Sequence, residues 1–181
     1  MKTRKLTINS ILLAIGLILH QITPTLLIPM QPDFSVAMLI VIILLNKKDY
    51  KTCIISCIVT GVFTALTTKF PGGQVPNFLD KLITANLIYI IINLFYKVKA
   101  FDRLLEHKKE ALLSTLIFPI GTLISGTTFL YLASFIVGLL ASFLTLFITV
   151  VLPTCFLNLF VGIFLYKTIK ISIKRFSVKD F

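Results

Sequence analysis

Charged residues are scarce in this chain, and their scarcity excludes most classes of water-soluble protein. Only 14% of the 181 residues are charged, whereas 57% are hydrophobic, and the mean hydropathy is +0.99. Soluble domains average about 25% charged and roughly 45–50% apolar residues. Because the apolar residues form long runs separated by short charged stretches, we expect a single membrane domain over residues 1–181.

The chain also lacks the motifs of several enzyme classes. No G-x-x-x-x-G-K-[ST] phosphate-binding loop occurs, so the chain does not hydrolyse ATP through that motif. H-E-x-x-H and G-x-S-x-G are absent as well. The three cysteines, Cys53, Cys57 and Cys155, lie in apolar runs without a nearby histidine that would complete a metal site. We therefore expect a protein that is not an enzyme and that binds no metal or cofactor itself.

Positive charge is in excess, but its distribution does not indicate nucleic-acid binding. The net charge is +11, and the basic residues crowd between and beyond the apolar runs. The positive-inside rule places such residues in the cytoplasm. With six crossings, all 18 lysines and arginines except Lys69 and Lys81 fall on one side. Both termini are therefore predicted to be cytoplasmic.

Six apolar segments are predicted to cross the bilayer, which gives an all-α fold. Their approximate ranges are residues 6–23, 31–45, 52–68, 77–96, 111–131 and 142–166. The charge-free stretch 111–166 has basic residues at both ends, so it must cross an even number of times, with an outer turn near residues 131–142. The basic stretch 97–110 predicts a short interfacial helix on the cytoplasmic face.

The second apolar segment is too short for an ordinary span. Its apolar part, residues 34–45, would reach only about 18 Å as a helix, against a hydrocarbon core of about 30 Å. Either residues 30–33 continue at membrane depth or the helix stops short. The third segment ends early at a Pro-Gly-Gly turn. Short segments interrupted by proline are typical of solute sites, and we expect an outward-facing cavity here.

Polar side chains with suitable chemistry gather at this outer end. Asp33, Lys69, Asp80 and Lys81 are its ionisable residues, apart from His20. Asn77 is predicted to cap the fourth helix, with Asp80 and Lys81 in its first turn. A capping acid and a snorkelling lysine are the simpler interpretation of that pair. An ionisable residue at membrane depth is otherwise a functional hypothesis.

A zwitterionic ligand such as an amino acid would suit this set. Asp33 or Asp80 could accept an ammonium group, and Lys81 or Lys69 could meet a carboxylate. Further candidate ligand contacts are the amides of Gln74 and Asn77, the rings of Phe70 and Phe78, and His20, although an interfacial histidine more often has no ligand.

A pair of small residues on the first helix predicts close approach of another helix. Ser10 and Ala14 lie four residues apart, which places them on one helix face. The spacing alone does not identify the partner helix.

Together these residues resemble the tryptophan transporter (TrpP) family, which comprises substrate-binding S components of energy-coupling factor (ECF) transporters in Gram-positive bacteria. The resemblance covers roughly residues 11–85. Its most specific part is Phe70-Pro71-x-Gly73-Gln74-x-Pro76-Asn77-x-x-Asp80-Lys81. The other matching pieces are Ile15-Gly16, Leu19-His20, Pro24, Pro32-Asp33 and Ala65-Leu66-Thr67-Thr68.

The resemblance implies a six-helix S component in the plasma membrane that binds tryptophan from outside. It implies a transmembrane coupling subunit and two cytoplasmic ATPase subunits as partners, with ATP used by those ATPases. In such proteins a small-residue patch on the first helix, often Ala-x-x-x-Ala, docks on the coupling subunit. Here the patch is Ser10-x-x-x-Ala14, a mild departure.

Three other interpretations fit parts of the pattern. A stand-alone secondary transporter of an aromatic amino acid could couple protons or sodium through Asp33 or Asp80. An intramembrane enzyme could use the same acids as a carboxylate dyad, but Lys81 and Lys69 in the same loops argue against the split pKa values that a dyad needs. A scaffold subunit without a substrate would need no polar cavity. The sequence does not distinguish tryptophan from tyrosine or an indole derivative.

Overall fold

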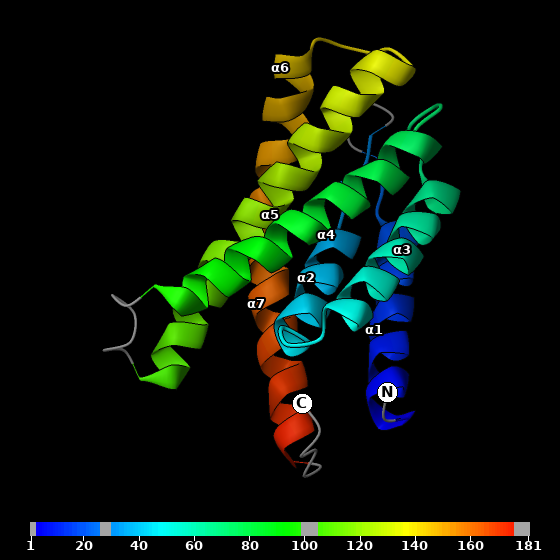
Figure 1. Cartoon of the computed structure of the whole chain (residues 1–181). Helices are drawn as coiled ribbons and strands as arrows, with labels where there is room; N and C mark the ends of the chain where they lie inside the picture. The colour runs from blue at the N-terminus through cyan, green and yellow to red at the C-terminus, as the bar shows by residue number, and fades with distance from the viewer. Residues whose placement is uncertain (1–2, 26–29, 99–104, 176–181) are drawn as a thin grey trace.

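The computed structural model describes residues 3–25, 30–98 and 105–175, and it is helical throughout its regular parts. The described elements form six helical passes, of which the last is built from three consecutive pieces; Figure 1 shows their arrangement. The elements are α1 (Thr3–Ile22), α2 (Ser35–Leu45), α3 (Tyr50–Thr67), α4 (Gln74–Lys97), α5 (Glu106–Ile136), α6 (Phe143–Leu146), the π-helix η2 (Phe147–Val151) and α7 (Leu152–Arg175).

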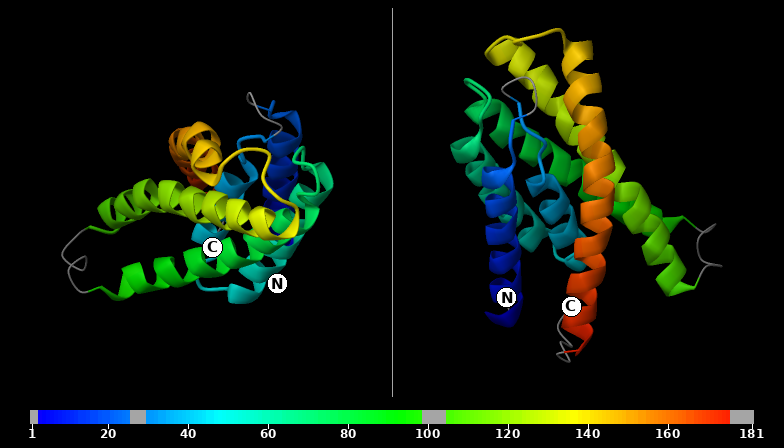
Figure 2. Two further views of the ribbon diagram at one scale, coloured as in Figure 1. Left: turned by 90° about the horizontal axis from the view of Figure 1, so that it is seen from above. Right: turned by 180° about the vertical axis from the view of Figure 1, so that it is seen from behind.

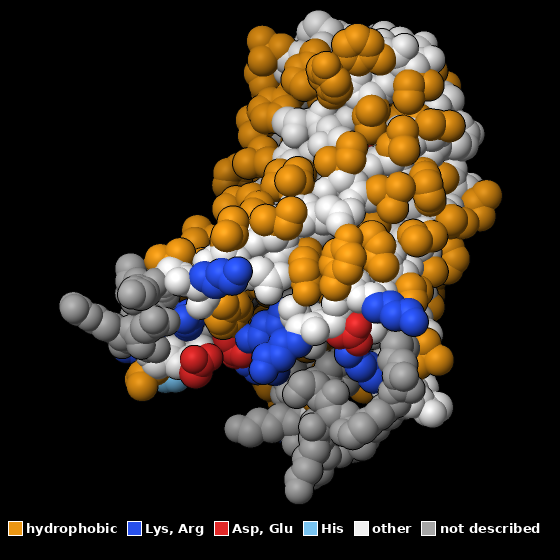
Figure 3. Space-filling view, viewed as in Figure 1, with side chains coloured by type: hydrophobic (Ala, Val, Ile, Leu, Met, Phe, Trp, Pro, Cys, Tyr) orange, Lys and Arg blue, Asp and Glu red, His pale blue; other side chains and the backbone are white. Residues whose placement is uncertain are grey.

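The passes alternate in direction, so the start of α1 and the end of α7 lie at the same end of the bundle (Figures 1 and 2). Lysine, arginine and acidic side chains gather at that end in the face seen in Figure 3, whereas hydrophobic side chains cover the rest. Five helices are long and apolar enough to cross a membrane, and α2 is a shorter apolar helix. The chain is therefore a multi-pass, all-α membrane protein of about six helices.

Helix α2 forms the centre of the bundle. Its sequence is apolar on every side, which is typical of a helix that is buried all round, and ten of its eleven residues are buried. It contacts α1, α3, α4, α5 and α7. At about 1.5 Å per residue it is only ~17 Å long, so its outer end stops inside the bundle and leaves space above it.

Two helix starts differ from the sequence prediction. Helix α2 begins at Ser35 rather than at residue 31, because the Asp33 side chain accepts hydrogen bonds from the backbone N (2.9 Å) and Oγ (2.5 Å) of Ser35. Helix α4 begins at Gln74, so Asn77 is not its N-cap and Asp80 and Lys81 lie in its second turn. The turn before α4 needs Gly72, whose φ of +70° disfavours other residues.

The basic linker and the outer turn between the last two passes also differ in detail. The described part of the stretch 97–110 holds no separate interfacial helix, because α4 extends to Lys97 and α5 already begins at Glu106. The remaining residues of that prediction, 99–104, and the stretch 26–29 of the first outer loop lie outside the described residues. The outer turn is confined to residues 137–142.

The last pass contains a π-helical segment directly before Pro153. Proline has no N–H to donate to the preceding turn, and such a gap is a common cause of helix irregularity. η2 covers Phe147–Val151, and α7 begins at Leu152. Pro119, in contrast, is accommodated inside the continuous helix α5.

Candidate binding pocket

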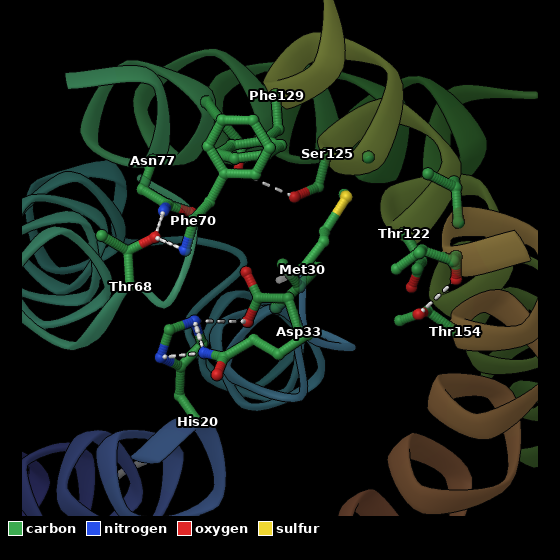
Figure 4. Close-up of a pocket in the computed structure, with 16 residues that line it drawn as sticks. His20, Met30, Asp33, Thr68, Phe70, Asn77, Thr122, Ser125, Phe129 and Thr154 are labelled. Atoms are coloured by element: carbon green, nitrogen blue, oxygen red, sulfur yellow. Dashed lines mark hydrogen bonds and ion pairs between the residues drawn. The ribbon is translucent and has the colours of Figure 1, made fainter. Parts of the chain in front are cut away.

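A cavity lies above the outer end of α2 (Figure 4), at the opposite end of the bundle from the basic side chains that gather in the face of Figure 3. The enclosed volume of this cavity is about 50 Å³, below the roughly 300–1,000 Å³ of sites that enclose a small molecule. Its walls come from the segment before α2, the α3–α4 turn, and helices α1, α4, α5 and the last pass. The lining residues are His20, Met30, Gln31, Asp33, Val36, Thr68, Phe70, Asn77, Asp80, Thr122, Ser125, Gly126, Phe129, Val150, Val151 and Thr154.

Lys81 joins two of the acids at the floor of this pocket. Its Nζ lies 2.7 Å from Asp33 Oδ2 and also donates to Asp80 Oδ2. The Lys81 side chain is 0% exposed and that of Asp80 only 1%, whereas that of Asp33 is 21% exposed. Buried charges of this kind are tolerated in a protein interior only when they are paired and hydrogen-bonded.

Hydroxyl groups complete the polar cluster around the lysine. Ser125 of α5 donates to Asp80 Oδ2 at 2.9 Å, and its Oγ lies 3.5 Å from Lys81 Nζ. Thr84, one turn further along α4, donates to Asp80 Oδ1 at 2.8 Å. The cluster therefore links α4, α5 and the segment before α2, with Asp33 as its most accessible member.

His20 reaches the pocket from α1 and has a polar partner at each ring nitrogen. The Thr67 hydroxyl donates to the Phe63 carbonyl (2.7 Å), so it must accept the Nδ1–H of His20 at 2.7 Å. The amide nitrogen of Gln31 lies 2.9 Å from Nε2 and 3.0 Å from Nδ1 of the same ring. His20 Nε2 is 4.0 Å from Asp33 Oδ1, beyond hydrogen-bonding distance.

The other half of the pocket is apolar and aromatic. The rings of Phe70 and Phe129 meet edge to face, with centroids 5.5 Å apart and an interplanar angle of 89°. Both residues are buried and line the cavity, as Figure 4 shows. At Gly126 a Cβ atom would lie 2.5 Å from Val151 Cγ1, so glycine permits α5 to approach the π-helical segment. The two halves match the chemistry of an aromatic ring with one charged end, which they could enclose only by moving apart.

The structure brings most of the candidate residues from the sequence to this cavity. His20, Asp33, Phe70, Asn77 and Asp80 line it, and Lys81 lies directly behind the two acids. Gln74 is exposed on the α3–α4 turn and does not line the cavity. Phe78 points to α3 instead, where its ring packs against the Gly61 position.

Lys69, another predicted partner for a carboxylate, bonds elsewhere. Its Nζ donates to the Thr23 carbonyl at 2.5 Å and it is not among the lining residues. It thereby fastens the α3–α4 turn to the end of α1.

Several lining residues have no counterpart among the sequence candidates. Ser125, Phe129, Thr122 and Thr154 belong to the last two passes, which were considered only for their hydrophobicity. A usable signal was present, because Thr122, Ser125 and Phe129 follow a spacing of three and four residues and thus share one face of α5. The side chains of Met30, Gln31 and Thr68 come from irregular segments, whose orientation no periodicity predicts.

A second feature lies on the membrane-facing side, away from the pocket. Ser10 and Ala14 are exposed, and they line a mostly apolar groove between α1 and α3. The other lining residues of this α1–α3 groove are Leu6, Asn9, Leu13, Leu17, Asp49, Lys51, Thr52, Ile55, Ser56, Val59 and Phe63. Among the described residues there is no cluster of histidine, cysteine and acidic side chains that could hold a metal ion.

Comparison with known proteins decides the family of this chain. Residues 2–174 match the family described as "Tryptophan transporter TrpP". The chain belongs to the TrpP tryptophan-transporter family. The curated TrpP relatives include a "Probable tryptophan transport protein" of Clostridium perfringens, 49% identical over 97% of this chain and 96% of the relative.

Two further TrpP relatives carry the same description. One, from Clostridium acetobutylicum, is 47% identical over 96% of both chains, and the other, from Bacillus subtilis, is 38% identical over 99% of this chain and 98% of the relative. No solved structure matches the chain.

Proposed function

We propose that this protein captures tryptophan outside the cell and serves as the substrate-specific S component of an ECF-type transporter in the plasma membrane. The observation that carries the proposal is one pocket in which a buried pair of phenylalanines faces a cluster of two acids and a lysine. Membership of the TrpP family and the printed descriptions of its curated relatives support tryptophan as the solute.

The chemistry of tryptophan matches the two halves of the pocket. The indole ring would lie against Phe70 and Phe129, where an edge-to-face or offset arrangement is favourable. The ammonium group would approach Asp33, with Asp80 behind it. Asn77 and Thr68, on the opposite wall, offer neutral hydrogen-bonding groups for the remaining polar atoms.

Energy for uptake has to come from outside this chain in our proposal, since its sequence has no phosphate-binding loop for ATP. The α1–α3 groove, with exposed Ser10 and Ala14, would receive a helix of the transmembrane coupling subunit. Two cytoplasmic ATPase subunits would use ATP and drive release of the solute inward.

One observation favours a second mechanism, that of a stand-alone secondary transporter. The pocket contains one buried and one partly buried carboxylate that a proton or sodium ion could neutralise during transport. Uptake that continues without the ATPase subunits and stops when an ionophore is added would support this alternative.

The binding step can be tested directly, because the chain contains no tryptophan. Indole fluorescence during titration of the purified protein with tryptophan therefore comes from the ligand. We expect a saturable shift of that fluorescence, and uptake by cells that depends on the ATPase subunits. A titration without saturation would contradict the binding role, whereas uptake without the subunits would contradict only the S-component role.

A further inference from the structure

The cations near the pocket are not available to a ligand. No lysine or arginine is among its described lining residues. Lys81 is fully buried behind the acids, and an ammonium group has three donors. All three are occupied, by Asp33 Oδ2, Asp80 Oδ2 and Ser125 Oγ. A ligand carboxylate could pair with Lys81 only by displacing one of the acids.

The two acids, in contrast, still have unused hydrogen-bond acceptor positions. An ionised carboxylate offers about four acceptor positions. Asp33 accepts two hydrogen bonds from Ser35 and one from Lys81, which leaves one position on Oδ2. Asp80 accepts from Lys81, Ser125 and Thr84, which leaves one position on Oδ1. Both acids line the cavity.

The remaining group that could bind a ligand carboxylate is a neutral hydrogen-bond donor. Thr68 Oγ1 accepts from Asn77 Nδ2 at 2.8 Å and from Phe70 N at 3.3 Å. These two bonds leave the Thr68 hydroxyl hydrogen to donate into the cavity that it lines. Both ring nitrogens of His20 are already engaged, by Thr67 Oγ1 and by the Gln31 amide.

We infer that the pocket selects its ligand by the amine and takes primary amines whose alkyl chain bears an aromatic group. It recognises a carboxylate on such a ligand only through neutral hydroxyl and amide groups. The inference rests on the proposed function and deepens it by assigning unequal weight to the two ends of tryptophan. Charge-assisted hydrogen bonds contribute about twice as much as neutral ones.

The test compares ligands that keep or lose one end of the molecule. Tryptamine and tryptophan methyl ester keep the amine, whereas indole-3-propionate and N-acetyltryptophan lose its charge. Each is titrated separately into the purified full-length protein by calorimetry. Loss of the carboxylate should weaken binding by at most about tenfold relative to tryptophan, and loss of the charged amine by about 10- to 100-fold.

Substitutions give an independent readout. Asp33→Asn should weaken tryptamine and tryptophan by about tenfold and leave indole-3-propionate unchanged or stronger. Glu106→Gln, which removes an exposed charge outside both the cavity and the groove, should leave all affinities unchanged. If Asp33→Asn does not fold, the ligand series on the unaltered protein still tests whether the amine determines binding.

The outcomes separate the two proposals. Indole-3-propionate that binds as tightly as tryptamine would overturn the inference, whatever the affinity of tryptophan. Tryptamine that binds while tryptophan does not would overturn the proposed function and support the preference for the amine.

Discussion

Lys81 Nζ and Asp33 Oδ2 lie 2.7 Å apart, and this ion pair fastens helix α4 to the irregular segment that precedes α2. Removing the lysine would leave two acids buried next to each other without compensation. We expect Lys81→Met to lower the free energy of unfolding by about 3–5 kcal/mol. Thermal unfolding in detergent measures the change.

The matched control for this prediction is Lys69→Met, because Lys69 is exposed and donates a single hydrogen bond, to Thr23 O. Lys69→Met should lower the free energy of unfolding by much less than Lys81→Met does. Adding Asp80→Asn to Lys81→Met should restore part of the lost stability, since it removes one of the two unpaired charges. A double variant no more stable than Lys81→Met would contradict this account of the cluster.

The aromatic pair should contribute to affinity rather than to folding alone. Phe129→Ala, which removes one wall of the ring site next to Phe70, is expected to weaken tryptophan binding roughly tenfold. Phe135→Ala, on the same helix but 73% exposed, should bind normally. Ligand fluorescence titration compares the variants, and equal affinities would remove Phe129 from the site.

The α1–α3 groove should matter for uptake but not for binding. Ala14→Phe fills the groove with a large side chain, so it should abolish uptake in cells while tryptophan binding by the purified variant persists. Ile11→Phe adds a similar ring on an exposed part of α1 that does not line the groove. Its uptake should be normal, and a loss equal to that of Ala14→Phe would argue against docking at this groove.

The end of the bundle that carries the basic residues should make stability depend on acid pH. Lys5 donates to Asp49 Oδ2 at 2.8 Å, and Thr52 donates to the same carboxyl. The hydrogen bond from Lys5 is the largest cause that holds the pKa of Asp49 below its ordinary value of 3.8. The Asp49 carboxyl therefore binds a proton less readily in the folded protein than in the unfolded chain.

The lowered pKa of Asp49 makes the folded protein less stable as the pH falls. The contribution of Asp49 is fully present above about pH 4 and is lost as the pH falls below that value. The melting temperature should decline less in Asp49→Asn than in the unaltered protein between about pH 6 and pH 3. Glu106→Gln, an exposed carboxyl at the start of α5, is the comparison variant. Identical declines in all three proteins would contradict the prediction.

Because α7 packs closely on α5, replacing one glycine of α7 should lower the stability of the protein. A Cβ atom at Gly162 would lie 2.3 Å from the ring of Phe118, which is fully buried and has no room to move aside. Gly162→Ala should cost about 1–3 kcal/mol of stability by overpacking. At Gly16 the nearest atom would be Met38 Cβ at 3.2 Å, so Gly16→Ala should cost less in the same melting experiment.

The number of passes was predictable because length and hydrophobicity determine it. The charge-free stretch 111–166 had to hold two crossings, and α5 and the last pass cover it. Helix ends were less predictable, because they depend on single side chains. Asn77 was assigned as a cap from its residue type, yet its amide donates to Thr68 and α4 starts one turn earlier.

The acidic half of the pocket was recognisable from sequence, whereas its aromatic half was recognised only in part. Ionisable residues are rare at membrane depth, so Asp33, Asp80 and Lys81 were conspicuous. Phenylalanine is common in membrane helices, and its role depends on the face that it occupies. Phe129 therefore gave no signal, and Phe78 was assigned to the pocket although it packs on α3.

Helix α2 has consequences for how the membrane acts on the protein. Since nearly all of its residues are enclosed by other helices, acyl chains touch the surrounding helices and not this one. Changes in bilayer thickness should therefore tilt the outer helices while the innermost segment keeps its surroundings. The base of the cavity would then be insulated from lipid composition, and ligand affinity should be nearly equal in thin and thick bilayers.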